Sequence, residues 1–215
     1  MSIQHIWEVK AKNTPLLKKK CSHCNTDRFQ CSDKFRLNAQ KKNIDIWLIY
    51  RCVKCSNTYN MTVFSRIRTE SISKELFSKF SENNTEIAWK YAFSKEIMRK
   101  NNVEADWENV AYEILSPKLP VEDLINMNEE MVLFQIHCSF DFNMSVSALI
   151  RTCLGFSSST LNLLHESDAV YYNDRPFQKK YKFKNDDIIK INRQALINTY
   201  LTGKEDLLHN AEDDQ

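Results

Sequence analysis

The sequence is poor in glycine and proline, with two glycines and four prolines among its 215 residues. Loops that bind the phosphates of nucleotides need several closely spaced glycines, because the backbone must approach the phosphate oxygens. This scarcity excludes the kinase, NTPase and dinucleotide-binding fingerprints. The chain also lacks any run of about 18 apolar residues, the length that a membrane span needs, and any apolar segment of signal-peptide type. We therefore expect a cytoplasmic protein with no membrane partner.

Four of the seven cysteines form two Cys-x-x-Cys pairs, Cys21 with Cys24 and Cys52 with Cys55. Two such pairs are typical of a zinc site in which each pair lies in a tight turn. Four thiolates complete a tetrahedron and leave no position for water or substrate. We therefore expect a structural zinc that supports folding rather than a catalytic metal.

Other assignments of the cysteines explain the spacing less well. Ordinary thiols or two disulfides would not require these two pairs. His23 and Cys31 are close enough in sequence to replace one ligand, but we place both outside the ligand set. A side chain within the knuckle usually points outward, and Cys31 falls near the start of a predicted strand. Cys138 and Cys153 have apolar neighbours and are expected to be buried, reduced thiols.

Charge is distributed unevenly along the chain. Residues 1–68 contain 14 lysines and arginines against 4 acidic residues, whereas residues 69–215 contain 16 against 24. This asymmetry suggests that the basic part meets a polyanion, or an acidic surface of its own or another chain.

The sequence pattern predicts an α+β fold in four segments. Residues 1–68 are expected to form a small zinc-ribbon sheet, with strands at 3–9, 29–38, 44–52 and 59–67. Residues 69–141 are a helical and strand middle segment, with two helices in 71–100 broken near 82–84, a strand in 103–115, a linker at 116–121, a turn at 122–126 and a strand at 131–138.

The third predicted segment, residues 142–192, combines two short helices with strands. The helices are expected at 144–153 and 157–166, joined by a left-handed corner at Gly155. Strands follow at 169–175, 179–183 and 187–191, with Asn173 and Asp174 suited to a tight turn. The fourth segment, 193–215, comprises a helix at 193–201 and an acidic tail at 205–215 that is expected to be disordered.

Residues 142–192 resemble the RNA-binding domain named after the fourth protein of the small ribosomal subunit, the S-four domain. The resemblance is carried by Leu149, residues 154–159, Leu163, Leu164, residues 169–173, residues 181–183 and residues 187–191. It implies an αα-β unit whose helices present basic residues to structured RNA. Of these only Arg151 is present on the helices, and cations reappear at Arg175, Lys179, Lys180 and Lys182.

The whole chain is also similar to an uncharacterised bacterial family catalogued as a domain of unknown function, number 1062. Residues 35–42 and 44–52 carry this resemblance together with both cysteine pairs. The family implies an architecture and no established activity.

Three classes of function follow from these features. We expect first a non-enzymatic, zinc-containing RNA-binding or ribosome-associated protein that binds mainly through phosphate contacts. The alternative is a protein-interaction or regulatory scaffold with a structural zinc and no nucleic-acid binding. An enzyme ranks third, because no characteristic spacing joins the candidate acids, bases and nucleophiles. These candidates are His137, Cys138, His165 and Glu166.

Overall fold

A computed structural model of the chain describes residues 4–117, 119–140 and 143–199. The contacts divide the chain into two compact units. One unit comprises residues 11–112, which we call the cysteine unit. The other combines residues 1–10 with 113–215, and we call it the carboxy-terminal unit. This grouping differs from the four consecutive segments expected along the sequence, because the chain passes from one unit to the other twice.

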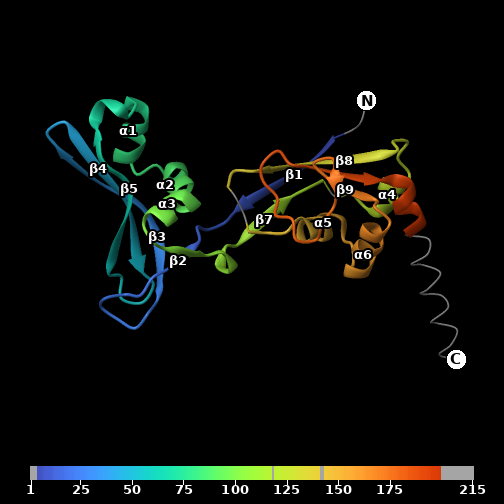
Figure 1. Cartoon of the computed structure of the whole chain (residues 1–215), viewed down its shortest axis with the longest axis horizontal. Helices are drawn as coiled ribbons and strands as arrows, with labels where there is room; N and C mark the ends of the chain where they lie inside the picture. Colours follow the sequence, from blue (N-terminus) through green and yellow to red (C-terminus); the bar gives the residue numbers. More distant parts are fainter. Residues whose placement is uncertain (1–3, 118, 141–142, 200–215) are drawn as a thin grey trace. The chain divides into compact units, whose positions relative to one another are not determined.

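The cysteine unit is built on a five-stranded sheet with the order β5-β4-β3-β2-β6 (Figure 1). Its strands are β2 (Leu16–Lys18), β3 (Arg28–Gln40), β4 (Asn43–Cys52), β5 (Thr58–Arg68) and β6 (Glu104–Asp106). The strands expected at 29–38, 44–52 and 59–67 are confirmed, and they pair antiparallel. Strand β4 alternates between buried and less buried residues because its β-branched and aromatic side chains lie on the two faces of the pleat.

Three short helices pack on this sheet where two were predicted. They are α1 (Lys74–Ser81), α2 (Thr85–Ala92) and α3 (Lys95–Lys100), and 3-10 turns occupy Thr69–Ser71 and Trp107–Asn109. The predicted second helix is divided because the Ser94 side chain accepts a hydrogen bond from the backbone N–H of Ile97 and begins a new helix. Ser73 and Asn84 cap the other two helices in the same way.

An aromatic cluster fills the space between these helices and the sheet. Phe80 is completely buried, and its ring lies 4.8 Å from that of Phe35 and 5.7 Å from that of Tyr91. Phe64 on β5 completes the group at 6.0 Å from Phe80. Such edge and offset contacts between rings stabilise a core beyond the area that they bury. Residues 74–100 therefore belong with the cysteine unit rather than with a separate middle segment.

The carboxy-terminal unit contains a six-stranded sheet with the order β10-β9-β11-β8-β1-β7. Its elements are β1 (Gln4–Ala11), β7 (Tyr112–Leu115), α4 (Val121–Ile125), β8 (Met131–Cys138), α5 (Val146–Leu154), α6 (Ser158–Glu166), β9 (Val170–Tyr172), β10 (Arg175–Pro176) and β11 (Ile188–Asn192). Strand β1 pairs parallel with β8, so that Trp7 lies opposite Ile136. The amino-terminal strand β1 therefore belongs to the sheet of the carboxy-terminal unit.

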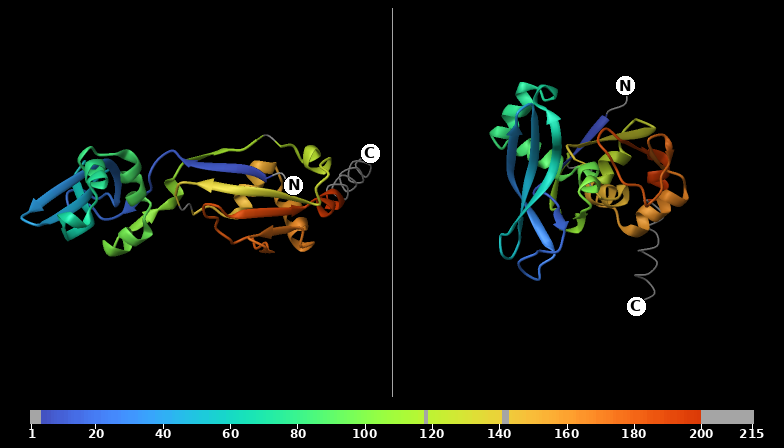
Figure 2. Two further views of the ribbon diagram at one scale, coloured as in Figure 1. Left: turned by 90° about the horizontal axis from the view of Figure 1, so that it is seen from above. Right: turned by 60° about the vertical axis from the view of Figure 1, so that its left-hand side comes forward.

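Helices α5 and α6 cover one face of this sheet (Figure 2). Gly155 ends α5 in the left-handed conformation, with φ of 68°, as predicted. The buried residues of segment 142–192 include Leu149, Leu154, Phe156, Leu161, Leu164, Val170 and Ile189. The segment does not close a sheet by itself, because β11 pairs with β8 as well as with β9.

Three expectations about this part of the chain need correction or lie outside the described residues. The strand expected at 179–183 is wrong, since only an isolated bridge between Ser145 and Lys182 is present there. The strand expected within 103–115 is two strands, β6 and β7, in different sheets. Residues 193–199 are helical, whereas the end of that predicted helix and the acidic tail at 205–215 lie outside the described residues.

Within residues 4–117, 119–140 and 143–199, no helix has the length and apolarity needed to cross a membrane.

Candidate metal centre

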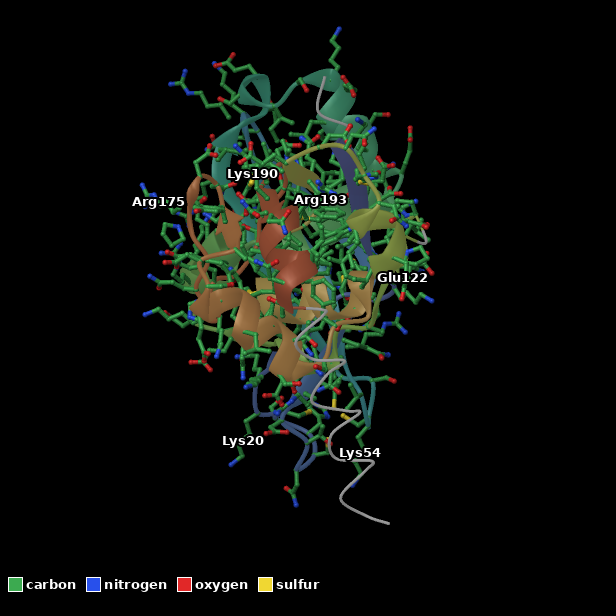
Figure 3. The ribbon with its side chains drawn as sticks, turned by 90° about the vertical axis from the view of Figure 1, so that its right-hand side faces the viewer. Lys20, Lys54, Glu122, Arg175, Lys190 and Arg193 are labelled. Atoms are coloured by element: carbon green, nitrogen blue, oxygen red, sulfur yellow. The ribbon has the colours of Figure 1, made fainter. Side chains whose placement is uncertain are left out.

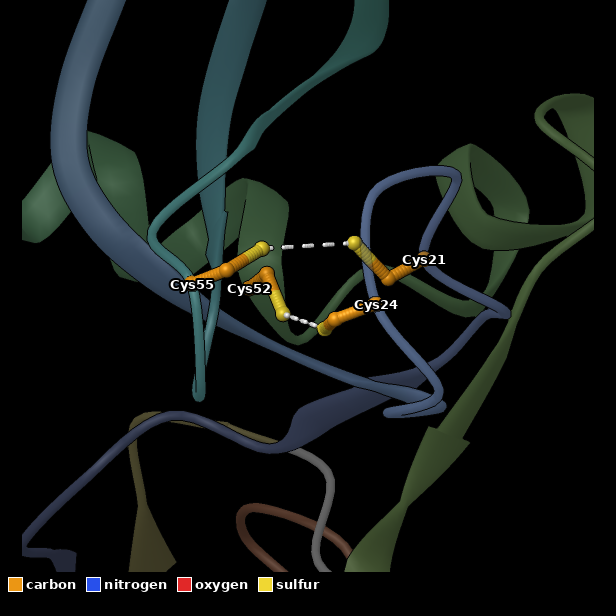
Figure 4. A group of neighbouring side chains, drawn as sticks. All are labelled: Cys21, Cys24, Cys52 and Cys55. Carbon is orange, nitrogen blue, oxygen red and sulfur yellow. Dashed lines mark hydrogen bonds between the residues drawn. The ribbon is translucent and has the colours of Figure 1, made fainter.

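The two Cys-x-x-Cys pairs meet at one end of the cysteine unit's sheet. Cys21 and Cys24 lie in the loop between β2 and β3, and Cys52 and Cys55 lie where β4 turns into β5. The four sulfur atoms all lie within 4.8 Å of one another. The Cys21 and Cys55 sulfurs are 3.6 Å apart, and those of Cys24 and Cys52 are 3.5 Å apart (Figure 4).

These separations fit a single tetrahedral ion. Metal–sulfur bonds of about 2.3 Å in a tetrahedron place the sulfurs about 3.8 Å apart. These two sulfur–sulfur distances are slightly shorter, all others are at most 4.8 Å, and small shifts of the loops would bring them to that value. Each pair therefore contributes two ligands, and the described residues can hold a metal ion in an all-sulfur shell.

Backbone hydrogen bonds hold the loops in shape. In the first loop, the backbone N–H of Cys21 donates to the Thr26 carbonyl at 2.8 Å, and the N–H of His23 points at the Cys21 sulfur at 3.4 Å. In the second loop, the N–H of Cys52 donates to the Asn57 carbonyl at 2.8 Å. These two similar turns preorganise both cysteine pairs. Sequence reasoning missed Thr26 and Asn57, although both follow their pair by two residues.

The pKa values of both thiols in the first loop, Cys21 and Cys24, are lowered. Hydrogen bonds from the side chain and backbone of Thr26 lower the pKa of Cys24 to about 6. The His23 backbone N–H, followed by that of Cys24, lowers the pKa of Cys21 against the opposing effect of desolvation. Thiolates are the form that binds metals. The first loop therefore favours the metal-binding state of its two cysteines near neutral pH.

The pKa of the Cys55 thiol is shifted in the opposite direction. The backbone N–H of Asn57 favours the Cys55 thiolate, but desolvation and the neighbouring sulfurs together raise the pKa of Cys55 to about 12. A further negative charge beside other thiolates is costly unless a cation compensates it. A bound metal ion would supply that compensation.

His23 and Cys31 lie outside the cluster, as expected. His23 is exposed, and the group of potential ligands found among the described residues contains the four cysteines alone. Cys31 lies on β3 opposite Tyr50, and burial raises its pKa to about 12. It is therefore a neutral, structural thiol beside the metal centre.

A partly buried ion pair anchors the strand that leaves the first loop. The Arg28 Nε donates to the Asp106 carboxylate at 2.8 Å, and the Asn109 side chain donates to the same oxygen at 2.9 Å. Asp106 on β6 is 6% exposed, and the Arg28 hydrogen bond holds the pKa of its carboxyl below the ordinary value. Because the pKa is lowered in the folded state, the stabilisation is present above the ordinary carboxyl range and is lost as pH falls through the lowered pKa.

We predict that Asp106→Asn lowers the free energy of unfolding at pH 7, because it removes the buried carboxylate and leaves Arg28 paired with the exposed Asp27 alone. A double-mutant cycle with Arg28→Gln, measured by urea denaturation with zinc in excess, gives the coupling between the two side chains. The matched control is the exposed pair Glu75 and Lys79 on α1, at 2.6 Å. Equal coupling energies in the two cycles would contradict the structural role given to the partly buried pair.

Several cationic residues are close in sequence to the four cysteines. Lys18 and Lys20 precede the first cysteine pair and are exposed, and Arg51 and Lys54 lie in or next to the second pair. Lys20 and Lys54 extend from the two loops (Figure 3). The Lys19 ammonium lies 4.5 Å from the centre of the Tyr59 ring, a cation–π distance. The cysteine end of this unit is therefore rich in positive charge.

The other predicted site residues belong to the carboxy-terminal unit. Arg151, Arg175, Lys179, Lys180 and Lys182 are all exposed. The Arg151 Nε donates to the Phe156 carbonyl at 3.4 Å, and the Lys182 ammonium donates to the Asn143 carbonyl at 2.8 Å. Arg175, Lys179 and Lys180 form no side-chain ion pair with any described residue.

The single acid, base and nucleophile candidates do not converge. His137 and Cys138 are neighbours on β8, and their side chains lie on opposite faces of that strand, the first exposed and the second buried. The His165 ring packs edge-on against Phe177 at 5.7 Å, and Glu166 is exposed at the end of α6. Their positions give no arrangement of nucleophile and base.

Comparison with known proteins finds one family. Residues 37–176 match a family model described as "Protein of unknown function (DUF1062)". The match begins within β3, so it includes Cys52 and Cys55 but not Cys21 and Cys24. No curated protein and no solved structure gives a significant match.

Proposed function

The chain belongs to the DUF1062 family, whose model covers more than half of its length, and since this family's description states no activity we propose a function from the residues themselves. We propose that the protein is a zinc-containing, non-enzymatic RNA-binding or ribosome-associated protein. Its zinc is structural, held by Cys21, Cys24, Cys52 and Cys55. Its RNA contacts are made mainly to phosphates.

The donor set supports zinc over other ions. Soft thiolates disfavour magnesium and calcium, which prefer oxygen ligands, and four of them in a tetrahedron suit zinc. A closed shell leaves no position for a reacting water. The zinc would therefore hold the ends of β2, β3, β4 and β5 together and take no part in chemistry.

The observation that carries the RNA proposal is the surplus of exposed cations without acidic partners. Arg175, Lys179 and Lys180 lie close together in sequence after β9, and none is paired with a described acidic residue. Unpaired cations favour association with a polyanion through release of its counterions. The proposal also draws on the sequence resemblance of residues 142–192 to the S-four domain, in which Arg151 is the cation on the two helices.

The test is binding of a labelled structured RNA by the whole protein across a range of salt concentrations. Affinity should fall steeply as salt rises, and Lys179→Glu, Lys180→Glu and Lys182→Glu combined should weaken binding about equally for different RNA sequences. Arg151→Ala tests whether the helices dock, and Lys74→Glu with Lys90→Glu is a charge-reversal control on the cysteine unit. If the parent protein retains no RNA at low ionic strength, the proposal fails and the protein-interaction scaffold becomes the better account.

A further inference from the structure

The sheet of the cysteine unit has one face that its helices do not cover. Along β4, Ile44, Ile46, Leu48, Tyr50 and Cys52 are buried, and they share one hydrophobic core with Phe80, Ala88, Ala92 and Met98 of the helices. The residues between them on β4 point to the other face. These include Trp47 and Ile49, which are partly exposed.

Trp47 and Ile49 do not belong to that core. Among the described residues, the partly buried apolar side chains that pack against the core include neither Trp47 nor Ile49. The two side chains instead lie on the uncovered face, where large apolar groups are not required for packing. Packing within the core therefore does not account for the Trp47 indole on this face of the sheet.

Basic side chains border the two apolar ones. Arg36 on β3 lies directly opposite Trp47, and Lys34 lies opposite Ile49. Residues opposite one another across antiparallel strands share a face, with their Cβ atoms about 5 Å apart. Arg51 follows on the same face of β4, two residues beyond Ile49. We call the group Lys34, Arg36, Trp47, Ile49 and Arg51 the open-face patch.

The charges of the open-face patch are free of acidic partners. Lys34, Arg36 and Arg51 are exposed and form no ion pair with any described residue. The acidic residue of β4 is Asp45, whose carboxylate accepts the backbone N–H of Arg66 at 2.8 Å. Three unpaired cations around an indole thus make a surface complementary to a ligand with both negative charge and flat rings.

We propose that the open-face patch binds single-stranded nucleic acid, with an unpaired base stacked on Trp47 and phosphates held by Lys34, Arg36 and Arg51. The inference rests on the proposed RNA-binding function and assigns it a second surface, on the cysteine unit. Aromatic side chains on a sheet surface stack readily on unpaired bases, and the same rings cannot reach bases inside a duplex. A cationic surface with such a ring binds without strong sequence preference.

The test uses fluorescence anisotropy of a labelled 12-nucleotide oligouridylate with the full chain and bound zinc. Arg36→Glu with Arg51→Glu should reduce affinity and make the negative slope of log affinity against log salt less steep by about 1.4, the value for two lost phosphate contacts on a single strand. The matched control is Lys74→Glu with Lys90→Glu, which changes net charge equally on α1 and α2. That control should bind nearly as the parent does.

Trp47→Ala should weaken oligouridylate binding by about tenfold through loss of the stacked base, and Trp47→Phe should retain most of the affinity. Zinc content and the thermal transition must match those of the parent in each variant, which separates loss of binding from loss of fold. Binding of a duplex RNA of the same length should change little in Trp47→Ala, because bases inside a duplex cannot stack on the indole.

The outcomes distinguish this inference from the function on which it rests. If the parent binds RNA and the Arg36, Arg51 and Trp47 variants bind equally well, the open-face patch is overturned while RNA binding stands. If the parent binds no nucleic acid, both fail. An equal loss of duplex affinity in Trp47→Ala, or equal affinity of the parent for polyglutamate of the same charge, would overturn the assignment to single strands.

Discussion

Cys52→Ser is expected to abolish stoichiometric zinc binding and to unfold the cysteine unit. Cys52 is buried at the end of β4, and its sulfur lies 3.5 Å from that of Cys24. A structural zinc supplies an apparent binding free energy of about 10–16 kcal/mol at neutral pH. The whole stability of a typical domain is about 5–15 kcal/mol. Loss of one thiolate should therefore remove most of what keeps residues 11–112 folded.

The change is measured by zinc content after gel filtration under reducing conditions, together with hydrogen exchange of β3, β4 and β5. Cys31→Ser is the matched control, because Cys31 lies on β3 outside the sulfur cluster. It should keep one zinc and lose little protection. The metal assignment is contradicted if Cys52→Ser retains both its zinc and the protection of these strands.

Trp7→Ala is expected to destabilise the carboxy-terminal unit by about 3–5 kcal/mol, the usual cost of truncating a buried tryptophan. Trp7 is 1% exposed, and its ring stacks on that of Phe134 at 4.3 Å. The truncation would open a cavity beside the parallel strands β1 and β8. The zinc should stay bound, because Trp7 packs in the other unit despite its closeness in sequence to the first cysteine pair.

Hydrogen exchange can locate this effect. Protection should fall in β8, β11 and α5 while β4 keeps its protection. Ile6→Ala provides the control, since Ile6 is adjacent in sequence and 52% exposed, and it should change stability by less than about 0.5 kcal/mol. Loss of protection in β4 with β8 unchanged would show that the amino-terminal strand belongs to the cysteine unit.

Local patterns predicted the metal centre and much of the secondary structure. The cysteine spacing identified all four members of the sulfur cluster, because two short turns fix the ligands whatever lies between them. The alternation of residues 44–52 predicted β4, and Gly155 predicted the corner between α5 and α6. Each of these features depends on residues that are neighbours in sequence, so the pattern and the structure that it specifies occupy the same short segment.

Pairing between distant segments leaves no such local pattern. Residues 3–9 were expected to be a strand, but nothing in them indicates a parallel partner some 130 residues further along, at β8. The residues at 179–183 have strand-forming side chains, yet only Lys182 finds a bridge partner, at Ser145. The division of the chain into two units follows from these long-range pairings and not from composition.

The open-face patch does have a local signal in the sequence. In an alternating strand with one buried face, the other positions are normally polar. Residues 44–52 place Trp47 and Ile49 at such positions, between Asp45 and Arg51. Apolar side chains on the outer face of an otherwise regular strand can therefore indicate a binding surface from the sequence alone.

Our central proposal is that the cluster of Cys21, Cys24, Cys52 and Cys55 holds one zinc ion, on which the fold of the cysteine unit depends. X-ray absorption at the zinc edge of the purified, reduced protein measures both the ligands and their distances. We expect one zinc per chain with a first shell of four sulfur atoms at about 2.3 Å. A shell that contains nitrogen or oxygen, or protein that folds with no stoichiometric zinc, would show that the four cysteines do not form this site.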